Sequence, residues 1–420
     1  MVKSKRKNAD GQIKVAIGCQ GGGMHAAFAV GVLTKILRDL KERKGAGDET
    51  GFKLVGLSGT SAGALCALMV WYGLAPKKKK FGGGSEQEAI DKLNSFWDGF
   101  VAKEAAETAL NFLTYRTFWL EELEIPRIGV NAPTFGRPNP YGGLFKAVID
   151  CLPSLGVRKQ YFDLEKLLAE ACPALDNNSI DWEHVTTRLL IGASEVVNGF
   201  ETVFDSHVKK NPSKLENEGM NPPEKLKGKD RYWRQRLPLS LSGIAASGTL
   251  PSMREAEKIG PFHYWDGLYA HNPPVREFIT DTEEVPDELW IVRINPQQWP
   301  YVPIKNKDVQ DRQNELMGNL SLNKELDFIM SVNEWQHRYK DERFGEDHKP
   351  VVVRTIKMAE DVARDLSYSS KFDRSPDRMN DLRNHGEKIA ENWLDKWHED
   401  KAGSYPEDAG YYKREGVKQT

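Results

Sequence analysis

One serine has the neighbours that a catalytic nucleophile needs. Ser61 is the centre of a G-x-S-x-G run, with Gly59 and Gly63 two residues away on either side. A nucleophile elbow requires this spacing, because its serine occupies a strained turn between a strand and a helix where neighbouring side chains would collide. The run alone is a weak signal in a chain with 36 glycines, but apolar stretches typical of a strand and a helix flank it. We predict that Ser61 is a nucleophile with Gly59 and Gly63 as its elbow glycines.

A second glycine turn precedes the elbow. Gly21, Gly22 and Gly23 also stand between a strand pattern and a helix pattern. Backbone N–H groups at such a helix N-terminus can hold the oxyanion that forms when a serine attacks an ester carbonyl. Successive strand and helix units imply parallel strands, whose carboxyl ends share one edge of the sheet. We expect the three glycines to form an oxyanion hole that faces Ser61.

The serine needs a proton acceptor, and an aspartate late in the chain is the best candidate. Asp266 begins an Asp-Gly-Leu turn that a Pro-Pro pair follows at 273–274. A carboxylate at this place can take the serine proton directly, so we expect acyl transfer through a covalent intermediate without a metal or a cofactor. His271, five residues further on, is the alternative base of a Ser-Asp-His triad.

These motifs, in this order, resemble those of the patatin-like phospholipase family. The family has a glycine-rich oxyanion loop, a G-x-S-x-G elbow on the next strand unit and a D-G-G or D-G-A aspartate; the stretch AASGTLP at 245–251 also looks like the one before that aspartate. The resemblance covers about residues 13–295. It implies a three-layer α/β fold with a mostly parallel central sheet between flanking helices, and a Ser61–Asp266 dyad. The implied activity is that of a lipid acyl hydrolase, a phospholipase A-type enzyme or a general esterase.

The chain departs from the family pattern at two positions. The family loop usually continues with a basic residue, as in GGGxRG or GGGxKG, whereas this loop reads GGGMHA with His25. Leu268 occupies a place where a second small residue is common. Neither change removes a catalytic atom, but His25 leaves open whether a fixed cation assists the oxyanion loop.

The motifs permit three other interpretations. The loop also fits the dinucleotide fingerprint G-x-G-x-x-A, but no acidic residue ends the second strand to hold a ribose. A Ser-Asp-His α/β-hydrolase fits poorly, since its elbow comes well after its oxyanion loop. A catalytically weak lipid-binding or regulatory protein with the same fold is the alternative function.

The expected elements place the motifs in one α/β domain. Residues 13–17 and 53–57 have strand patterns, whereas 24–40 and 64–71 have the apolar spacing of helices. We predict a flexible tail over 1–11, a patatin-like acyl hydrolase domain over 12–305 and a mainly helical C-terminal extension over 306–420. Within the extension, 351–356 has a strand pattern, and 367–375 looks more loosely like the tail of some bacterial patatin-like proteins.

Composition limits the partners. The formal charge of −2 argues against a nucleic-acid binder, and the aromatic-rich helical stretch at 96–120 is the expected lining of a lipid pocket. Lys77 to Lys80 form a basic run that could dock on anionic lipid. No apolar run has the length of a bilayer span, and no apolar stretch of the length of a secretory signal follows the basic N-terminus. We expect a cytoplasmic protein whose contact with membranes is at most peripheral; no oligomeric state follows from the sequence.

The four cysteines are too far apart for a zinc or redox motif. They are Cys19, Cys66, Cys151 and Cys172. We expect free thiols in the core of a protein from a reducing compartment.

Overall fold

The structure is a computed structural model of the 420-residue chain. The residues that it describes are 12–46, 51–78, 83–122, 164–208, 234–251, 255–280, 284–304, 306–338 and 350–399. Cys151 lies outside this part of the chain, while Cys19, Cys66 and Cys172 are buried free thiols, as predicted.

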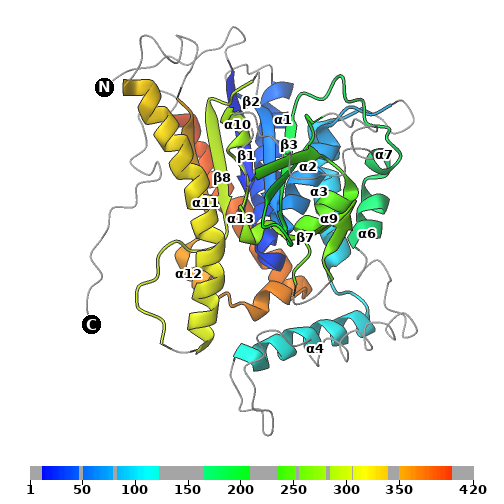
Figure 1. Ribbon diagram of the computed structural model, residues 1–420, viewed down its shortest axis with the longest axis vertical. Helices are drawn as coiled ribbons and strands as arrows, with labels where there is room; N and C mark the ends of the chain where they lie inside the picture. The colour runs from blue at the N-terminus through cyan, green and yellow to red at the C-terminus, as the bar shows by residue number, and fades with distance from the viewer. Residues whose placement is uncertain are drawn as a thin grey trace.

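A twisted sheet of nine strands runs through the molecule (Figure 1). Seven strands form its main path in the order β5-β4-β3-β2-β1-β8-β9, and β7 joins β3 while β6 joins β7. All neighbours pair in parallel except β3 with β4, β3 with β7 and β6 with β7. The strands are β1 Ile13–Cys19, β2 Phe52–Thr60, β3 Arg188–Glu195, β4 Glu201–Asp205, β5 Arg234–Pro238, β6 Glu257–Ile259, β7 Phe262–Asp266, β8 Glu288–Arg293 and β9 Val352–Lys357.

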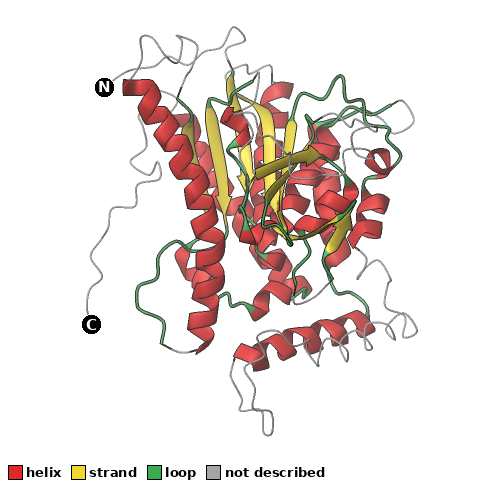
Figure 2. Cartoon of the chain, in the orientation of Figure 1, coloured by secondary structure: helices red, strands yellow, loops and turns green. Residues whose placement is uncertain are grey.

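Helices cover both faces of the sheet (Figure 2). The central strands β1 and β2 are almost wholly buried, which explains why their sequences read as apolar runs rather than as alternating patterns. The helices, including short 3-10 turns labelled η, are η1 Gly23–Ala26, α1 Ala27–Gly45, α2 Ala62–Leu74, α3 Glu86–Phe100, α4 Ala105–Glu122, α6 Leu164–Ala171, α7 Pro173–Asp176, α9 Leu241–Ser247, η5 Gly267–Tyr269, α10 Glu277–Thr280, α11 Asn306–Arg338, α12 Glu360–Arg364, η6 Ser369–Phe372 and α13 Pro376–Glu399.

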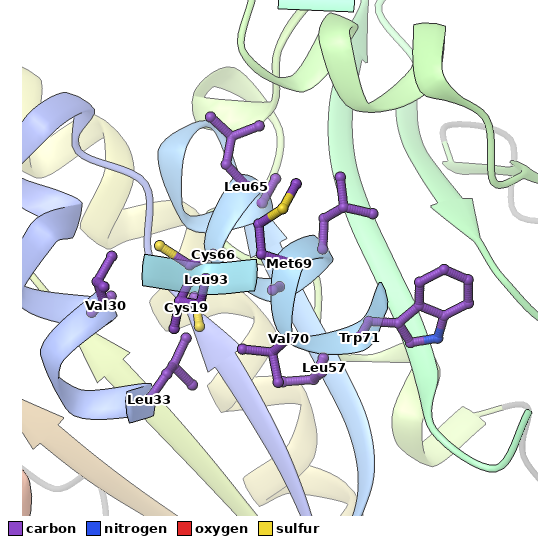
Figure 3. Packing of buried hydrophobic residues seen from close by; sticks show 14 of the residues in the cluster. Cys19, Val30, Leu33, Leu57, Leu65, Cys66, Met69, Val70, Trp71 and Leu93 are labelled. Carbon is purple, nitrogen blue, oxygen red and sulfur yellow. The ribbon is translucent and has the colours of Figure 1, made fainter. Parts of the chain in front are cut away.

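The larger apolar core lies between the sheet and the helices α1, α2, α3 and α13. Its side chains include Val30 and Leu33 of α1, Leu57 of β2 and Trp71 of α2, which are among the cluster residues labelled in Figure 3. Helix α2 is apolar on every side because it is enclosed by the sheet and by α3. The helix that follows Ser61 is therefore buried from Ala62 to Gly73.

A second apolar core lies on the other face of the sheet. Here Leu322 and Ile329 of α11 pack with Leu289 and Ile291 of β8, and Phe278 of α10 closes the cluster. The two cores make three layers of helix, sheet and helix. The predicted fold class, a mostly parallel central sheet flanked by helices with a helical C-terminal region, is confirmed.

The C-terminal region is built into the same sheet. Strand β9 pairs in parallel with β8, and α13 has its most extensive packing against α1. The strand pattern at 351–356 thus corresponds to β9. The domain boundary at 305 stays a prediction.

Helices α1 and α13 cross at two glycines. A Cβ at Gly386 would lie 2.1 Å from the backbone oxygen of Phe28, and one at Gly31 would lie 1.9 Å from that of Arg383. Because backbone atoms occupy this space, the helices must separate to admit any side chain. Since α1 follows the glycine loop through the short turn η1, this crossing also fixes the position of the helix that begins after the loop.

We predict that Gly386→Ala lowers the free energy of unfolding by about 2–3 kcal/mol through overpacking, despite the better helix propensity of alanine. Denaturant unfolding followed by circular dichroism measures the change. Gly45→Ala is the matched control, since a Cβ there meets nothing within 4 Å. Equal stability of the two variants would contradict the crossing geometry.

Candidate active site

The turn at Ser61 has the geometry of a nucleophile elbow. Ser61 has φ 56° and ψ −131°, a left-handed conformation that is strained for a residue with a side chain. A Cβ at Gly59 would lie 2.3 Å from the Gly63 oxygen, and one at Gly63 would lie 2.3 Å from the Cys19 oxygen. Both elbow positions therefore require glycine. The partly exposed Ser61 stands between β2 and the first turn of α2.

Strand β3 brings the aspartate beside the elbow. Thr60, the last residue of β2, pairs with Gly192 of β3, and the next residue, Ala193, pairs with Asp266 at the end of β7. Strand β4 pairs with the other edge of β3 as far as Ser194. Strand β7 therefore pairs with the same edge of β3 as β2, starting where β2 ends. Thr60 and Asp266 thus pair with adjacent residues of β3. Because Ser61 follows Thr60, this register brings Ser61 and Asp266 together although they are far apart in the sequence.

The carboxyl group of Asp266 is fully buried. Its Oδ1 accepts a 2.8 Å hydrogen bond from the backbone N–H of Leu268, and Oδ2 accepts none of ordinary geometry from the described residues. Burial raises the pKa of Asp266 to about 7, against the opposing effects of the Ser61 hydroxyl, the Leu268 N–H and, more distantly, Lys371. A carboxylate with this pKa, facing the serine hydroxyl, is poised to take a proton near neutral pH.

Hydrogen bonds from the surrounding residues hold both Ser61 and Asp266 in place. The Ser61 N–H donates to the Ser247 hydroxyl at 2.9 Å, and the Asp266 N–H donates to the Thr249 carbonyl at 2.9 Å. The Ser194 hydroxyl in turn donates to the Asp266 carbonyl at 3.0 Å. Residues 245–251, which had no assigned role in the sequence, therefore hold both Ser61 and Asp266.

The glycine loop lies directly against the nucleophile. A Cβ at Gly21 would meet the Thr60 oxygen at 2.5 Å and the Ser61 Cβ at 2.8 Å. The Gly21 N–H, however, donates to the buried Asn272 side-chain oxygen at 2.6 Å. This hydrogen bond occupies one of the three predicted oxyanion donors. Gly22 and Gly23, which are partly exposed, are the loop positions left for that role.

Asn272 is a residue that sequence reasoning missed. It belongs to the segment after Asp266, and that segment is bound to β2: the Thr60 hydroxyl donates to the His271 carbonyl at 2.7 Å, and the Ser58 hydroxyl donates to the Pro274 carbonyl. Asn272 therefore ties the aspartate segment to the glycine loop. Its position just before a Pro-Pro pair was the only signal in the sequence, and that signal is not specific.

The loop leads straight into a helix. Gly23 has φ 58°, and a Cβ there would lie 2.5 Å from the Lys371 backbone oxygen, so glycine is required on both counts. The 3-10 turn η1 then continues into the 19-residue helix α1. The partial positive charge of this helix N-terminus favours an anion at the loop.

His25 does not supply a positive charge to the loop. Its ring is buried, and Nε2 lies 2.7 Å from the Ser370 hydroxyl of η6. Burial, with help from Lys371 and Arg378, lowers the pKa of His25 well below its ordinary value. The imidazole is thus neutral, and it connects the start of α1 to the C-terminal region.

The alternative base, His271, lies on a different side of the strand end. Its buried Nε2 is 3.0 Å from the Thr202 carbonyl, and its ring packs on Gly192 of β3. Because a carbonyl only accepts hydrogen bonds, Nε2 carries the proton. Burial, followed by Arg234, lowers the pKa of His271. These contacts favour a packing role for the histidine.

Leu268 occupies its unusual position without disturbing the site. Its backbone N–H holds Asp266, and its side chain packs against Gly318 of α11. Gly267, beside it, could carry no side chain, because a Cβ would lie 2.5 Å from the Gly192 oxygen. The first small residue of the motif is therefore essential, whereas the second is replaceable.

Two expectations about the surroundings of the site are wrong in part. The Lys77 ammonium, expected on an exposed docking patch, is buried, pairs with Glu88 at 2.7 Å and lies over the Tyr72 ring; Lys79 and Lys80 lie outside the described residues. Phe96 and Trp97, expected in a lipid pocket, are core residues. An apolar pattern does not tell a core-facing ring from a pocket-facing one.

The motif geometry agrees with a family comparison. The family model described as patatin-like phospholipase matches residues 19–279, more than half of the chain. The chain belongs to this family. A comparison with curated proteins finds no match. Among the described residues, no helix is both long enough and apolar enough to cross a membrane.

Two solved structures are similar to this member of the patatin-like family at low identity. VipD from Legionella pneumophila is 13% identical with a TM-score of 0.36, and the comparison covers 93% of this chain and 69% of VipD. The ExoU–SpcU complex of the type III secretion system of Pseudomonas aeruginosa is 12% identical with a TM-score of 0.27; the comparison covers 90% of this chain and 52% of that one. This chain thus spans about half of the second structure's chain.

We predict that Asp266→Asn stabilises the protein at pH 8. A carboxyl whose pKa rises from 3.8 in the unfolded chain to about 7 in the fold binds more protons when folded between these pH values. Its contribution to stability therefore falls as pH rises through this window, and above it the fold contains a buried charge. An amide has no such charge and can still accept from Leu268.

Thermal melts of both proteins at pH 5 and pH 8 measure this effect. The melting temperature of the variant should exceed that of the wild type by more at pH 8 than at pH 5. A difference that is the same at both pH values would show that the Asp266 carboxyl is not protonated at pH 5 in the fold.

Proposed function

We propose that the protein is a lipid acyl hydrolase that uses Ser61 as nucleophile and Asp266 as base. The observation that carries this proposal is that Thr60 and Asp266 pair with adjacent residues of β3. The strained Ser61, which follows Thr60, therefore lies beside a desolvated carboxylate. Membership of the patatin-like phospholipase family supports lipid hydrolysis in general terms.

The first half of the reaction forms an acyl-enzyme. The Ser61 oxygen attacks the ester carbonyl carbon while Asp266 takes the hydroxyl proton, and the carbonyl oxygen becomes an oxyanion. We assign the stabilisation of this charge to the N–H groups of Gly22 and Gly23, which lie at the start of η1 and shortly before α1. The intermediate then collapses, and the alcohol leaves with the proton held by Asp266.

The second half releases the fatty acid. Water attacks the acyl carbonyl and gives a proton to Asp266, and the proton returns to Ser61 as the acyl–oxygen bond breaks. Since Asp266 must be ionised to begin each half, kcat/KM should rise with pH through about 7. The reaction requires no metal or cofactor.

Exposed apolar side chains near the site favour a lipid substrate. The segment after β8 lies at the same sheet edge as the elbow, because β8 runs parallel to β1. Tyr301, Val302 and Ile304 in this segment are 53%, 71% and 87% exposed. Tyr269, which ends η5 beside Asp266, is also exposed. These side chains can enter a lipid surface while the dyad faces it.

We predict that a fluorophosphonate probe labels Ser61 and that Ser61→Ala abolishes labelling. Peptide mass analysis identifies the site. On a soluble nitrophenyl ester, Asp266→Asn should lower kcat about 10²- to 10⁴-fold, the usual value of a general base. A folded Ser61→Ala variant that still reacts with the probe at the same rate would defeat the assignment.

His271→Gln is the matched control for the base, because an amide can still donate to the Thr202 carbonyl. We expect this variant to retain most of the ester activity. If it is folded and inactive while Asp266→Asn is folded and active, the triad replaces the dyad. If the wild type is folded and hydrolyses no ester or phospholipid, the alternative of a lipid-binding protein without turnover replaces the proposal.

We predict that changing Tyr301, Val302 and Ile304 together to serine lowers binding to phospholipid vesicles at least tenfold, because each buried apolar side chain contributes about 1.5–3 kcal/mol. Vesicle sedimentation measures the binding. Activity on a soluble ester should not change. Val285→Ser is the control, since exposed Val285 precedes β8 and lies toward the opposite sheet edge. Equal losses in the two variants would refute a membrane-facing role for 301–304.

A further inference from the structure

A lysine from the C-terminal region lies against the oxyanion loop. Lys371 belongs to η6, and its backbone oxygen and Cβ are the atoms that a side chain at Gly23 would strike, at 2.5 Å and 3.0 Å. The neighbouring Ser370 bonds to His25 of the same loop. Two consecutive residues of η6, Ser370 and Lys371, thus contact His25 and Gly23 of the loop.

The Lys371 ammonium lies about one helical turn along α11 from the aspartate turn, because Nζ bonds to Asn314 and the Leu268 side chain packs against Gly318. Lys371 lowers the pKa of Asp266, and Asp266 in return raises that of Lys371. Two more carboxylates of α11, Glu315 and Asp311, also favour the charged lysine. These four groups form one electrostatic cluster around the site.

The hydrogen-bonding groups of this cluster leave the ammonium only partly satisfied. Among the described residues, Nζ bonds to the neutral side-chain oxygen of Asn314 and to no carboxylate. Glu315 is occupied by Arg312 at 3.1 Å and by the Trp299 N–H at 2.7 Å, and Asp311 accepts the Tyr368 N–H at 2.6 Å. Among the described residues, therefore, these carboxylates act on the ammonium from a distance and none forms an ion pair with it.

The loop itself has no cation. His25 stands where the family commonly has a basic residue, and burial keeps its ring neutral. We infer that Lys371 supplies the fixed positive charge of the oxyanion loop, from a segment about 350 residues away in the sequence. It is a positioning residue: it acts through Asp266 and through the field at Gly22 and Gly23. This inference rests on the proposed Ser61–Asp266 mechanism.

The charge has two effects that can be measured separately. It favours ionised Asp266, so the base is available at lower pH. It also stabilises the oxyanion as the negative charge develops, which raises kcat without tightening the binding of a neutral ester. Burial lowers the pKa of Lys371 to about 8, so the second effect is lost above that pH.

The test is a pH–rate profile from pH 5 to 10 on an uncharged nitrophenyl ester, with Ser61→Ala as the blank. The wild type should give a bell that rises through about 7 and falls above about 8. Lys371→Arg should keep the rise and lose the fall, because a guanidinium stays charged at pH 10. If Lys371→Arg is folded and active but its rate still falls above about pH 8, the inference is wrong.

Lys371→Gln should lower kcat about 10- to 100-fold with little change in KM, and should move the rising limb to higher pH. Its amide can still bond to Asn314, and thermal melts report its folding. If Lys371→Gln does not fold, the Lys371→Arg profile decides alone. A folded Lys371→Gln with the wild-type profile would overturn the inference.

Arg378→Gln is the matched control, because Arg378 is a cation of the same region that also lowers the pKa of His25 but pairs with Asp373 at 2.9 Å. Its profile should keep both limbs. If Arg378→Gln loses the falling limb as well, the effect belongs to general charge and not to Lys371.

Wild-type activity that does not exceed the Ser61→Ala blank would refute the proposed function and, with it, the role of Lys371. Activity that depends on Ser61 but not on Lys371 would refute only the present inference.

Discussion

The active site depends on one strand that pairs with two others at consecutive residues. Gly192 and Ala193 of β3 receive the ends of β2 and β7, and this register alone brings a serine and an aspartate together from opposite parts of the domain. Glycine at 192 is part of the arrangement, since a Cβ would meet both Thr60 and His271. The hydrogen bonds from Thr60 and Ser58 to the segment after Asp266 then hold the register.

Burial of the Asp266 carboxyl lowers the stability of the fold but favours the proposed proton transfer. A carboxyl without full hydrogen bonding is costly inside a protein, and the fold partly avoids that cost by raising the pKa of the group to about 7. In the proposed mechanism, the same desolvation makes the carboxylate a strong enough acceptor for a serine proton. The surrounding support, from Ser247 and Thr249 to Asn272, is what keeps so unfavourable a group in place.

The sequence was sufficient for features whose cause is local. The elbow follows from two glycines around Ser61, and the parallel sheet follows from alternating strand and helix patterns; the chain's family agrees with both. Features that depend on distant partners were not predictable. The Gly21 N–H is taken by Asn272 and Lys77 is buried by Glu88, because of contacts that only the folded chain creates. Lys371 lies in the stretch 367–375, whose loose likeness to a family tail assigns no role to the lysine.

The contact between η6 and the glycine loop has a consequence for the order in which a working protein is made. Ribosomes complete residues 13–295, with the whole serine–aspartate pair, before residues 369–372 exist. Contacts so remote along the chain close late, since the loop-closure entropy must be overcome first. During synthesis, therefore, the nascent domain has Ser61 and Asp266 but not the segment that rests on the loop. Under the proposed function, hydrolytic competence matures only when the last part of the sheet and its helices have docked.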